Sequence, residues 1–100
     1  MKTPTDCTSL NDVRSAIDQV DRQILALLGL RADYVHAAAR FKTSEADVAA
    51  PERQAAMMRV RRQWAESEGL DANVIEKIYR DLVDYFIARE REHWKATQLR

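Results

Sequence analysis

The chain has 100 residues, of which 46% are hydrophobic and 32% are charged, with two glycines and two prolines. This length suits one small domain spanning residues 1–100, and this composition favours helices over a β-rich or disordered chain. Lysines plus arginines number 16, as do aspartates plus glutamates, so the formal charge is zero and no basic excess points to nucleic acid as a partner.

The N-terminal segment and the single cysteine bear on location. The start, MKTPTDCTSLNDV, lacks the apolar core of a signal peptide, and no run approaches the roughly 20 apolar residues of a membrane span. Cys7 has no second cysteine with which to form an internal disulfide. A reducing, cytoplasmic setting away from membranes is therefore expected.

A seven-residue apolar repeat predicts a long first helix from about Ser9 to Phe41. Its two series are Leu10, Ile17 and Ile24, and Val13, Val20 and Leu27. Such a repeat is typical of a helix that packs along a seam. Asp12, three residues after Ser9, forms a variant of the capping box. Gly29 interrupts the helix and should cost about 1 kcal/mol relative to Ala, unless another helix approaches closely there.

The length of this helix predicts a homodimer. A helix of roughly 33 residues is about 50 Å long, whereas a compact domain of this size has a radius of gyration near 13 Å. The helix would overhang its own fold and leave part of its seam in water. A second copy of the chain is expected to cover that part, which makes the homodimer obligate.

Two further helices are expected after a loop at residues 43–50, TSEADVAA, where the apolar period breaks. Pro51 fits the first turn of a short second helix, and Gly69 suits its C-terminal cap. Asp71 is suited to cap a third helix that runs to the mid-nineties. The apolar positions of these helices are Met57, Val60, Trp64, Val74, Ile75, Ile78, Leu82, Val83, Phe86 and Ile87. The predicted fold class is all-α, with a long, a short and a long helix.

Arg31 occupies a seam position at which an apolar residue is expected. A cation at such a position is hard to keep hydrated, so it needs a partner. Lys42 follows eleven residues later, which predicts that the two side chains lie within about 20° of the same helix face and about 16 Å apart along the axis. Both side chains are long, and the gap between them suits a small anion.

Three other charged residues lie on or beside apolar faces of the predicted helices. Arg14 lies at the edge of the seam, Arg53 in the first turn of the second helix, and Glu90 on the apolar side of the third. Any of them, like Lys42, can instead be a solvated residue whose stem covers apolar surface.

Plain structural roles remain open for Arg31 and Glu90. An ion pair would explain the position of Arg31 without a ligand, and its possible partners are Asp18, Asp21 and Glu90. Arg89 and Arg91 flank Glu90, so a solvated face is an equal alternative for that residue.

No metal, cofactor or nucleophile is expected. His36 and His93 lie on different predicted helices without companions at metal-ligand spacing, and Cys7 lies in the N-terminal segment. The sequence also contains no glycine-rich phosphate loop.

Four segments carry a family resemblance: MKTPTDCT, DVRSAIDQVDRQILALLGLRADYV, AAARFKTSEA and APERQAAM. They resemble the all-helical chorismate mutase family and, within it, the isochorismate pyruvate lyases of bacterial salicylate and siderophore biosynthesis. The framework R…D…D…LL…R…K along the first helix is the part most specific to the family. The resemblance implies an intertwined dimer with two equivalent active sites.

The resemblance also implies roles for the candidate residues. Arg31 and Arg53 would bind substrate carboxylates, and Lys42 and Glu90 would act at the ether oxygen. Arg14 would reach in from the other subunit. The substrate would be a dicarboxylate, isochorismate or chorismate, and its pericyclic reaction needs no nucleophile, metal or cofactor.

Glu90 departs from the family pattern, in which bacterial members place a glutamine at this position. A glutamine amide can donate to the ether oxygen at any pH, whereas an ionised glutamate can only accept. Glu90 must therefore be protonated to take that role, or else pair with Lys42 or an arginine.

Three functions stay open. The first is an isochorismate pyruvate lyase with secondary chorismate mutase activity, and the second is a dedicated chorismate mutase. Mutases often carry an acid where this chain has Gln54, which favours the lyase. The third is a non-catalytic helical dimerisation module, against which the cations on apolar faces count.

Overall fold

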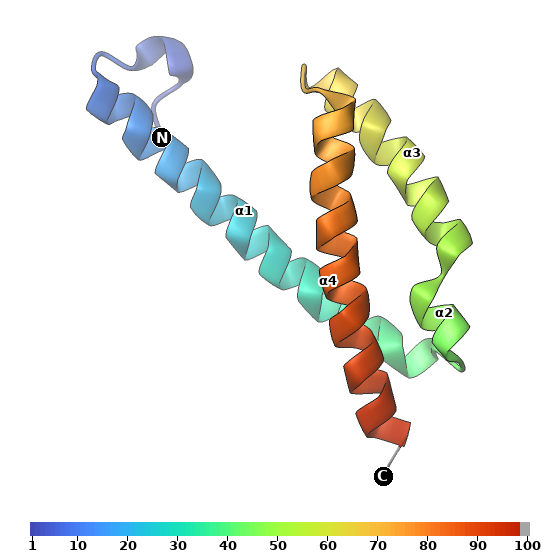
Figure 1. The fold of residues 1–100 in the computed structure, drawn as a ribbon. Coiled ribbons are helices and arrows are strands. Elements are labelled where there is room, and N and C mark those ends of the chain that lie inside the picture. Colours follow the sequence, from blue (N-terminus) through green and yellow to red (C-terminus); the bar gives the residue numbers. More distant parts are fainter. Residues whose placement is uncertain (99–100) are drawn as a thin grey trace. The chain divides into compact units, whose positions relative to one another are not determined.

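A computed structural model describes residues 1–98, and this part of the chain contains helices and no strands (Figure 1). Its elements are η1 (Pro4–Asp6), α1 (Leu10–Ala38), η2 (Ala39–Phe41), α2 (Glu45–Ala49), α3 (Pro51–Ser67) and α4 (Ala72–Gln98), where η marks a 3₁₀ turn. The chain divides into two compact units, Met1–Tyr34 and a second that begins at Val35. The all-α prediction is confirmed, and the three predicted helices correspond to α1, α3 and α4. None of the described helices combines the length and apolar character needed to cross a bilayer.

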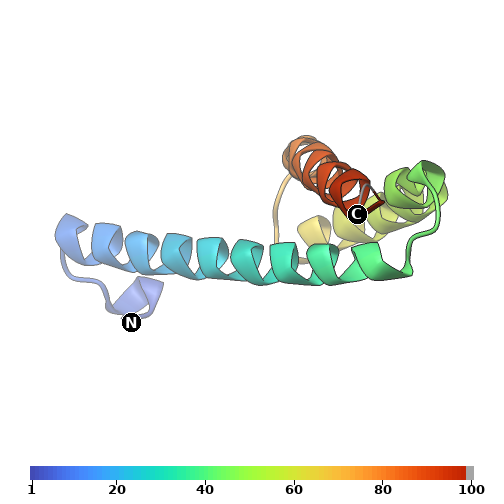
Figure 2. The same ribbon diagram turned by 90° about the horizontal axis from the view of Figure 1, so that it is seen from below.

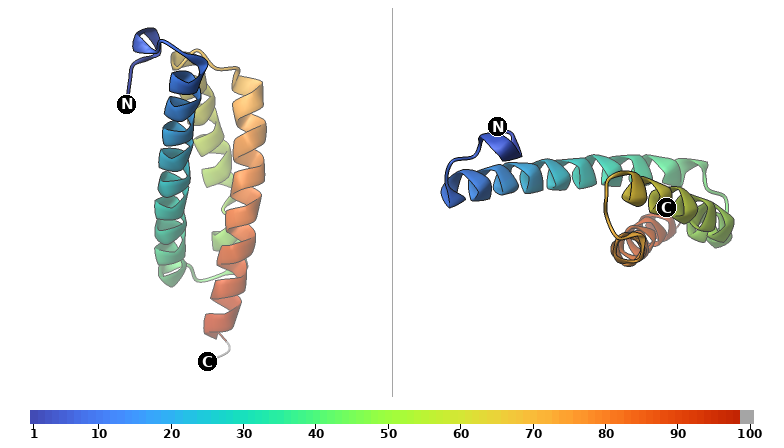
Figure 3. Two further views of the ribbon diagram at one scale, coloured as in Figure 1. Left: turned by 90° about the vertical axis from the view of Figure 1, so that its left-hand side faces the viewer. Right: turned by 90° about the horizontal axis from the view of Figure 1, so that it is seen from above.

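The start of α1 is capped by the residues that the sequence indicated. The Oγ of Ser9 accepts the N–H of Asp12 (3.1 Å), and the Asp12 carboxylate accepts both the N–H (3.0 Å) and the hydroxyl (3.1 Å) of Thr8. The backbone N–H of Thr8, followed by Lys2 at 2.9 Å, lowers the pKa of Asp12 below its usual range. These contacts fold the N-terminal turn back beside the first turns of α1 (Figures 2 and 3).

The apolar seam of α1 is largely exposed within the first unit. No residue of α1 is buried, and Ile17, Ile24 and Leu27 are 52%, 48% and 64% exposed. A helix with such a stripe normally buries it against another element. At Gly29 the position of an added Cβ meets nothing within 4 Å. Much of the seam is therefore exposed surface within the first unit.

In the second unit, α3 and α4 pack side by side and are joined by a tight turn (Figures 1 and 3). Gly69 has the left-handed φ of +74°, and its N–H donates to Glu66 O (3.0 Å) while the next N–H donates to Ala65 O (2.8 Å). This pair of bonds is the Schellman motif. Two N–H groups in the first turn of α4 donate to Oδ1 of Asp71 (2.8 and 3.3 Å). The predicted caps at both positions are confirmed.

The segment expected to be a loop contains α2, so that expectation is wrong. Ser44 caps this five-residue helix by accepting the N–H of Asp47 (3.2 Å), and Ala50 ends it in the left-handed conformation with φ 40°. Pro51 then begins α3, as predicted. The helix forms despite the broken apolar period because Val48 is buried and α2 contacts α4.

The core of the chain is small. The buried apolar residues are Ala39, Val48, Met57, Ala65, Val83 and Phe86. Both η2 and α2 contact α4. The residues that follow α1 are therefore held against the C-terminal half of α4. This contact positions the site described next.

Candidate active site

Glu90 is the one buried charged residue in the part of the chain that the structure describes. Its side chain lies on α4 and is 6% exposed, and its Oε1 lies 3.5 Å from Nζ of Lys42. This separation allows an ion pair but is long for a hydrogen bond, and among the described residues Oε1 has no hydrogen-bond donor. A buried carboxylate oxygen without a hydrogen bond depends on a nearby cation or a proton.

The interpretation of Glu90 as a solvated residue between Arg89 and Arg91 is therefore wrong. Arg89 is directed to Tyr85 instead: its Nη1 donates to the Tyr85 hydroxyl at 3.2 Å, and its guanidinium lies 5.5 Å from the ring centroid. Of the alternatives that the sequence left open for Glu90, the structure places it beside Lys42.

Lys42 is held at both its backbone and its side chain. Its Nζ donates to Asp47 O at 2.8 Å and lies beside Glu90, while its carbonyl accepts the indole N–H of Trp94 at 3.3 Å. The Lys42 side chain is 24% exposed. An ammonium group carries three donors, so Lys42 keeps capacity for an incoming oxygen after these contacts.

Lys42 does not lie on α1, which corrects the geometry inferred from the sequence. The helix ends at Ala38, η2 follows, and Lys42 has an extended backbone with ψ 135°. The face shared by Arg31 and Lys42 was calculated for an unbroken helix, so that calculation does not apply. Because Lys42 has left the helix, its side chain can meet α4.

Sequence reasoning missed two residues that hold Lys42. Trp94 lies one turn after Glu90 on α4, at the i+4 spacing that places both on one face. Asp47 lies three residues after Ser44, the same capping signal that identified the start of α1. The Thr43 hydroxyl (2.7 Å) and N–H (3.0 Å) donate to the Asp47 carboxylate and lower its pKa below the usual range.

Arg14 and Arg31 both lie on α1 within the first unit. They are 17 residues apart, which places them about 25 Å apart along the axis and about 100° apart around it. One small substrate cannot contact both residues of the same helix.

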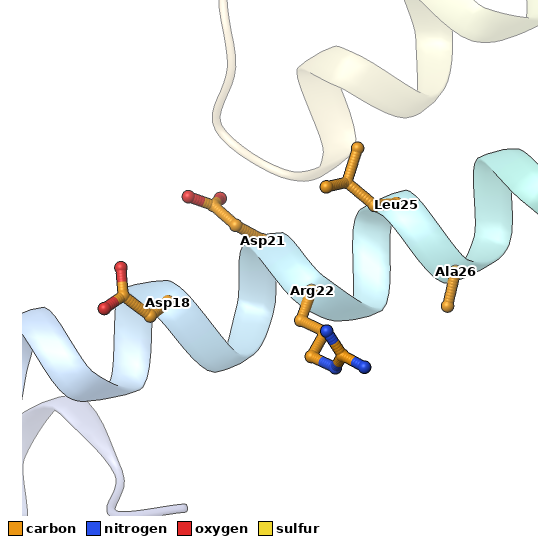
Figure 4. Close-up of a pocket in the computed structure, with 5 residues that line it drawn as sticks. All are labelled: Asp18, Asp21, Arg22, Leu25 and Ala26. Carbon is orange, nitrogen blue, oxygen red and sulfur yellow. The ribbon is translucent and has the colours of Figure 1, made fainter.

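The two aspartates considered as partners of Arg31 lie too far along the same helix. Asp18 and Asp21 are about 20 and 15 Å from Arg31 along the axis. They line a surface hollow together with Arg22, Leu25 and Ala26 (Figure 4). An ion pair of Arg31 with either aspartate of its own helix is therefore excluded.

Arg53 and Gln54 follow Pro51 in the first turn of α3. Arg53 is exposed and Gln54 is half-buried. Both belong to the unit that carries Lys42 and Glu90. An exposed guanidinium in the first turn of a helix can bind an anion together with the free backbone N–H groups there.

The arrangement suits binding and polarisation of an anionic oxygen rather than nucleophilic attack. A partly exposed ammonium is oriented by a carbonyl, and a buried acid lies beside it. Such groups stabilise negative charge that develops on an oxygen in the transition state.

The family model for chorismate mutase type II matches residues 13–91 of the chain. The chain belongs to the chorismate mutase type II family. The matched range contains all five candidate residues, Arg14, Arg31, Lys42, Arg53 and Glu90. The family resemblance inferred from the sequence is thereby confirmed.

Two curated relatives illustrate where the chain stands in this family. The chain is 50% identical to the isochorismate pyruvate lyase of Pseudomonas aeruginosa over 98% of its own length and 97% of that protein. It is 34% identical to the T-protein of Haemophilus influenzae over 84% of its own length and 22% of that protein. The first similarity spans two whole chains, whereas the second covers one part of a longer protein.

The ion pair predicts that substitutions at Lys42 and Glu90 have coupled effects on the free energy of unfolding. Lys42→Met leaves the buried Glu90 carboxylate without its cation, so we expect it to reduce the free energy of unfolding by about 2 kcal/mol. In the Glu90→Gln background the same substitution should cost less than about 1 kcal/mol, because no buried charge remains. Urea unfolding of the four proteins measures this coupling.

The control is Lys95→Met, which removes an exposed ion pair between α4 and α2. Lys95 Nζ lies 3.2 Å from Glu45 Oε1, and both side chains are more than half exposed. This substitution should cost at most about 0.5 kcal/mol. Equal costs for Lys42→Met with and without the Glu90 carboxylate would show that the two side chains are not coupled.

Proposed function

We propose that the chain is an isochorismate pyruvate lyase, which eliminates pyruvate from isochorismate to give salicylate, with secondary chorismate mutase activity. The observation that carries the proposal is the 50% identity to an enzyme of that name over nearly the full length of both chains. A role in salicylate or siderophore biosynthesis and a cytoplasmic location belong to the same proposal. The single cysteine, which leaves no internal disulfide, supports that location.

The proposed reaction takes place within the substrate. The bond between the ring and the enolpyruvyl ether oxygen breaks, and a ring hydrogen moves to the enolpyruvyl group. The ring leaves as salicylate and the side chain as pyruvate, so the atoms of isochorismate divide between the two products. The protein must hold a reactive conformer and stabilise charge on the ether oxygen.

Lys42 is the proposed donor to the ether oxygen. Its ammonium is partly exposed, and its direction is fixed by Asp47 O at 2.8 Å. Arg31 and Arg53 are the proposed partners of the substrate carboxylates, because a guanidinium donates to both oxygens of a carboxylate at once.

Glu90 affects this chemistry through its charge. While ionised it competes with the substrate for the Lys42 ammonium, 3.5 Å away, and it repels the negative ether oxygen. A neutral amide at this position would leave Lys42 to the substrate and could itself donate to the ether oxygen.

A homodimer is part of the proposal. The uncovered seam of α1 offers a continuous apolar stripe to a second copy. Arg14 and Arg31 are too far apart on α1 to share a substrate within one chain. An intertwined dimer, in which Arg14 enters the site of the other subunit, would meet both conditions and complete a single domain over residues 1–100.

A dedicated chorismate mutase is the second candidate, and membership of the chorismate mutase type II family favours it. Gln54, at a position where mutases often have an acid, favours the lyase. The non-catalytic dimerisation module is disfavoured because a pure interface needs no lysine beside a buried glutamate.

The products decide between these functions. Purified protein is incubated separately with isochorismate and chorismate, and the products are separated by chromatography. We expect salicylate and pyruvate from isochorismate and slower formation of prephenate from chorismate. Lys42→Met should lower the lyase rate by about a hundredfold or more, whereas Lys77→Met, at an exposed position of α4, should not. Prephenate alone would favour the mutase, and no product from either substrate would favour the module.

Mixed dimers test whether Arg14 acts in the other subunit. Arg14→Ala and Arg31→Ala should each abolish most activity as homodimers. After unfolding and refolding of an equal mixture, half of the dimers carry both variants, and one of their two sites is intact. We expect about a quarter of the wild-type activity to return. If both arginines act in the same chain, or if the protein is a monomer, mixing restores nothing.

A further inference from the structure

The segment between η2 and α3 is tied together by Asp47. Its carboxylate accepts the N–H (3.0 Å) and the hydroxyl (2.7 Å) of Thr43, and its carbonyl accepts Nζ of Lys42 (2.8 Å). One residue therefore binds both the side chain of Lys42 and the backbone of the residue that follows it.

We propose that Asp47 is a positioning residue, which fixes the direction of the Lys42 ammonium by closing this segment into one hydrogen-bonded unit. The proposal rests on the proposed function, in which Lys42 donates to the ether oxygen of the substrate. Asp47 itself need not touch the substrate.

The start of α1 provides an internal comparison. There Asp12 accepts the same two donors from Thr8, and Ser9 accepts the Asp12 N–H, as Ser44 accepts that of Asp47. The two motifs share their hydrogen bonds, but only the second holds a lysine that pairs with a buried acid. The capping bonds stabilise a helix end in both places, so a further effect on catalysis at Asp47 would be specific to Lys42.

The short helix depends on this motif more than a long helix does. The five residues of α2 are far fewer than an isolated helix needs in water. Ser44 and Asp47 fix its start, and the left-handed Ala50 before Pro51 fixes its end. Loss of the Asp47 carboxylate would loosen the segment and displace Lys42, and a displacement of about 1 Å can lower a rate a hundredfold.

A fall in pH should weaken the hydrogen bonds by which Asp47 holds Thr43 and Lys42 together. The Thr43 hydroxyl, followed by the Thr43 N–H, lowers the pKa of Asp47 below its usual range. A carboxylate with a lowered pKa stabilises the folded segment above the unfolded pKa and loses that effect as the pH falls through the folded value. The segment should therefore be fully closed at neutral pH.

The test compares Asp47→Ala and Asp47→Asn with Asp12→Ala and Asp12→Asn, using the full chain. Steady-state kinetics with isochorismate give kcat and KM, and NMR gives the exchange rate of the Trp94 indole N–H, which donates to Lys42 O. The exposed Trp64 indole serves as an internal reference. We expect Asp47→Ala to lower kcat about tenfold or more and to speed Trp94 exchange. Asp47→Asn, which keeps an oxygen acceptor, should have a smaller effect on both.

Both Asp12 variants should lower thermal stability, keep kcat within about twofold of the wild type and leave Trp94 exchange unchanged. Equal kinetic losses at Asp12 and Asp47, or unchanged kcat and Trp94 exchange in Asp47→Ala, would overturn the positioning role. If Asp47→Ala does not fold, Asp47→Asn decides by the same two readouts. A wild-type protein that converts neither isochorismate nor chorismate would overturn the proposed function instead, and Trp94 exchange would still show whether Asp47 holds Lys42.

Discussion

The buried carboxylate of Glu90 is the constraint on which the second half of the chain depends. The apolar core is small, and α4 nevertheless directs an acid into it. An ionised carboxylate there is stable only beside a cation, so Lys42 must be brought to α4. The end of α1 at Ala38, the turn η2 and the short helix α2 together allow this approach. The conformation of the segment that follows α1 is thus the one that brings Lys42 beside Glu90.

The first half of the chain differs, because most of its seam residues are exposed within their own unit. An exposed apolar stripe of this kind commonly marks an interface. In the proposed dimer this surface would both drive association and carry Arg14 into the other subunit. Folding and completion of the active site would then be one event, so the isolated chain would be inactive as well as unstable.

Local signals in the sequence predicted the ends of most helices. Ser9, Gly69 and Asp71 are caps whose chemistry acts over four or five residues, and each was found where expected. The helix α2 was missed because five residues are too few to show a helical period. The capping pair of this helix, Ser44 and Asp47, could nevertheless have been identified from the sequence.

Tertiary relations could be predicted only in part. The apolar spacing placed Glu90 on the inner side of α4, but its partner lies 48 positions earlier in the chain, and no local rule connects the two. The apolar period continued through Phe41, so nothing indicated that Lys42 would leave the helix. Trp94 and Asp47 gained their roles only once that departure had placed Lys42 against α4.

The measurement that tests the central role of the Lys42–Glu90 pair most directly is kcat/KM for the wild type and Glu90→Gln. Both proteins are assayed with isochorismate near neutral pH and at one ionic strength, because salt screens charge contacts. We expect the variant to be the more active protein, since its amide neither withdraws Lys42 nor repels the ether oxygen. Equal values, or a variant less active than the wild type, would contradict the role assigned to Glu90.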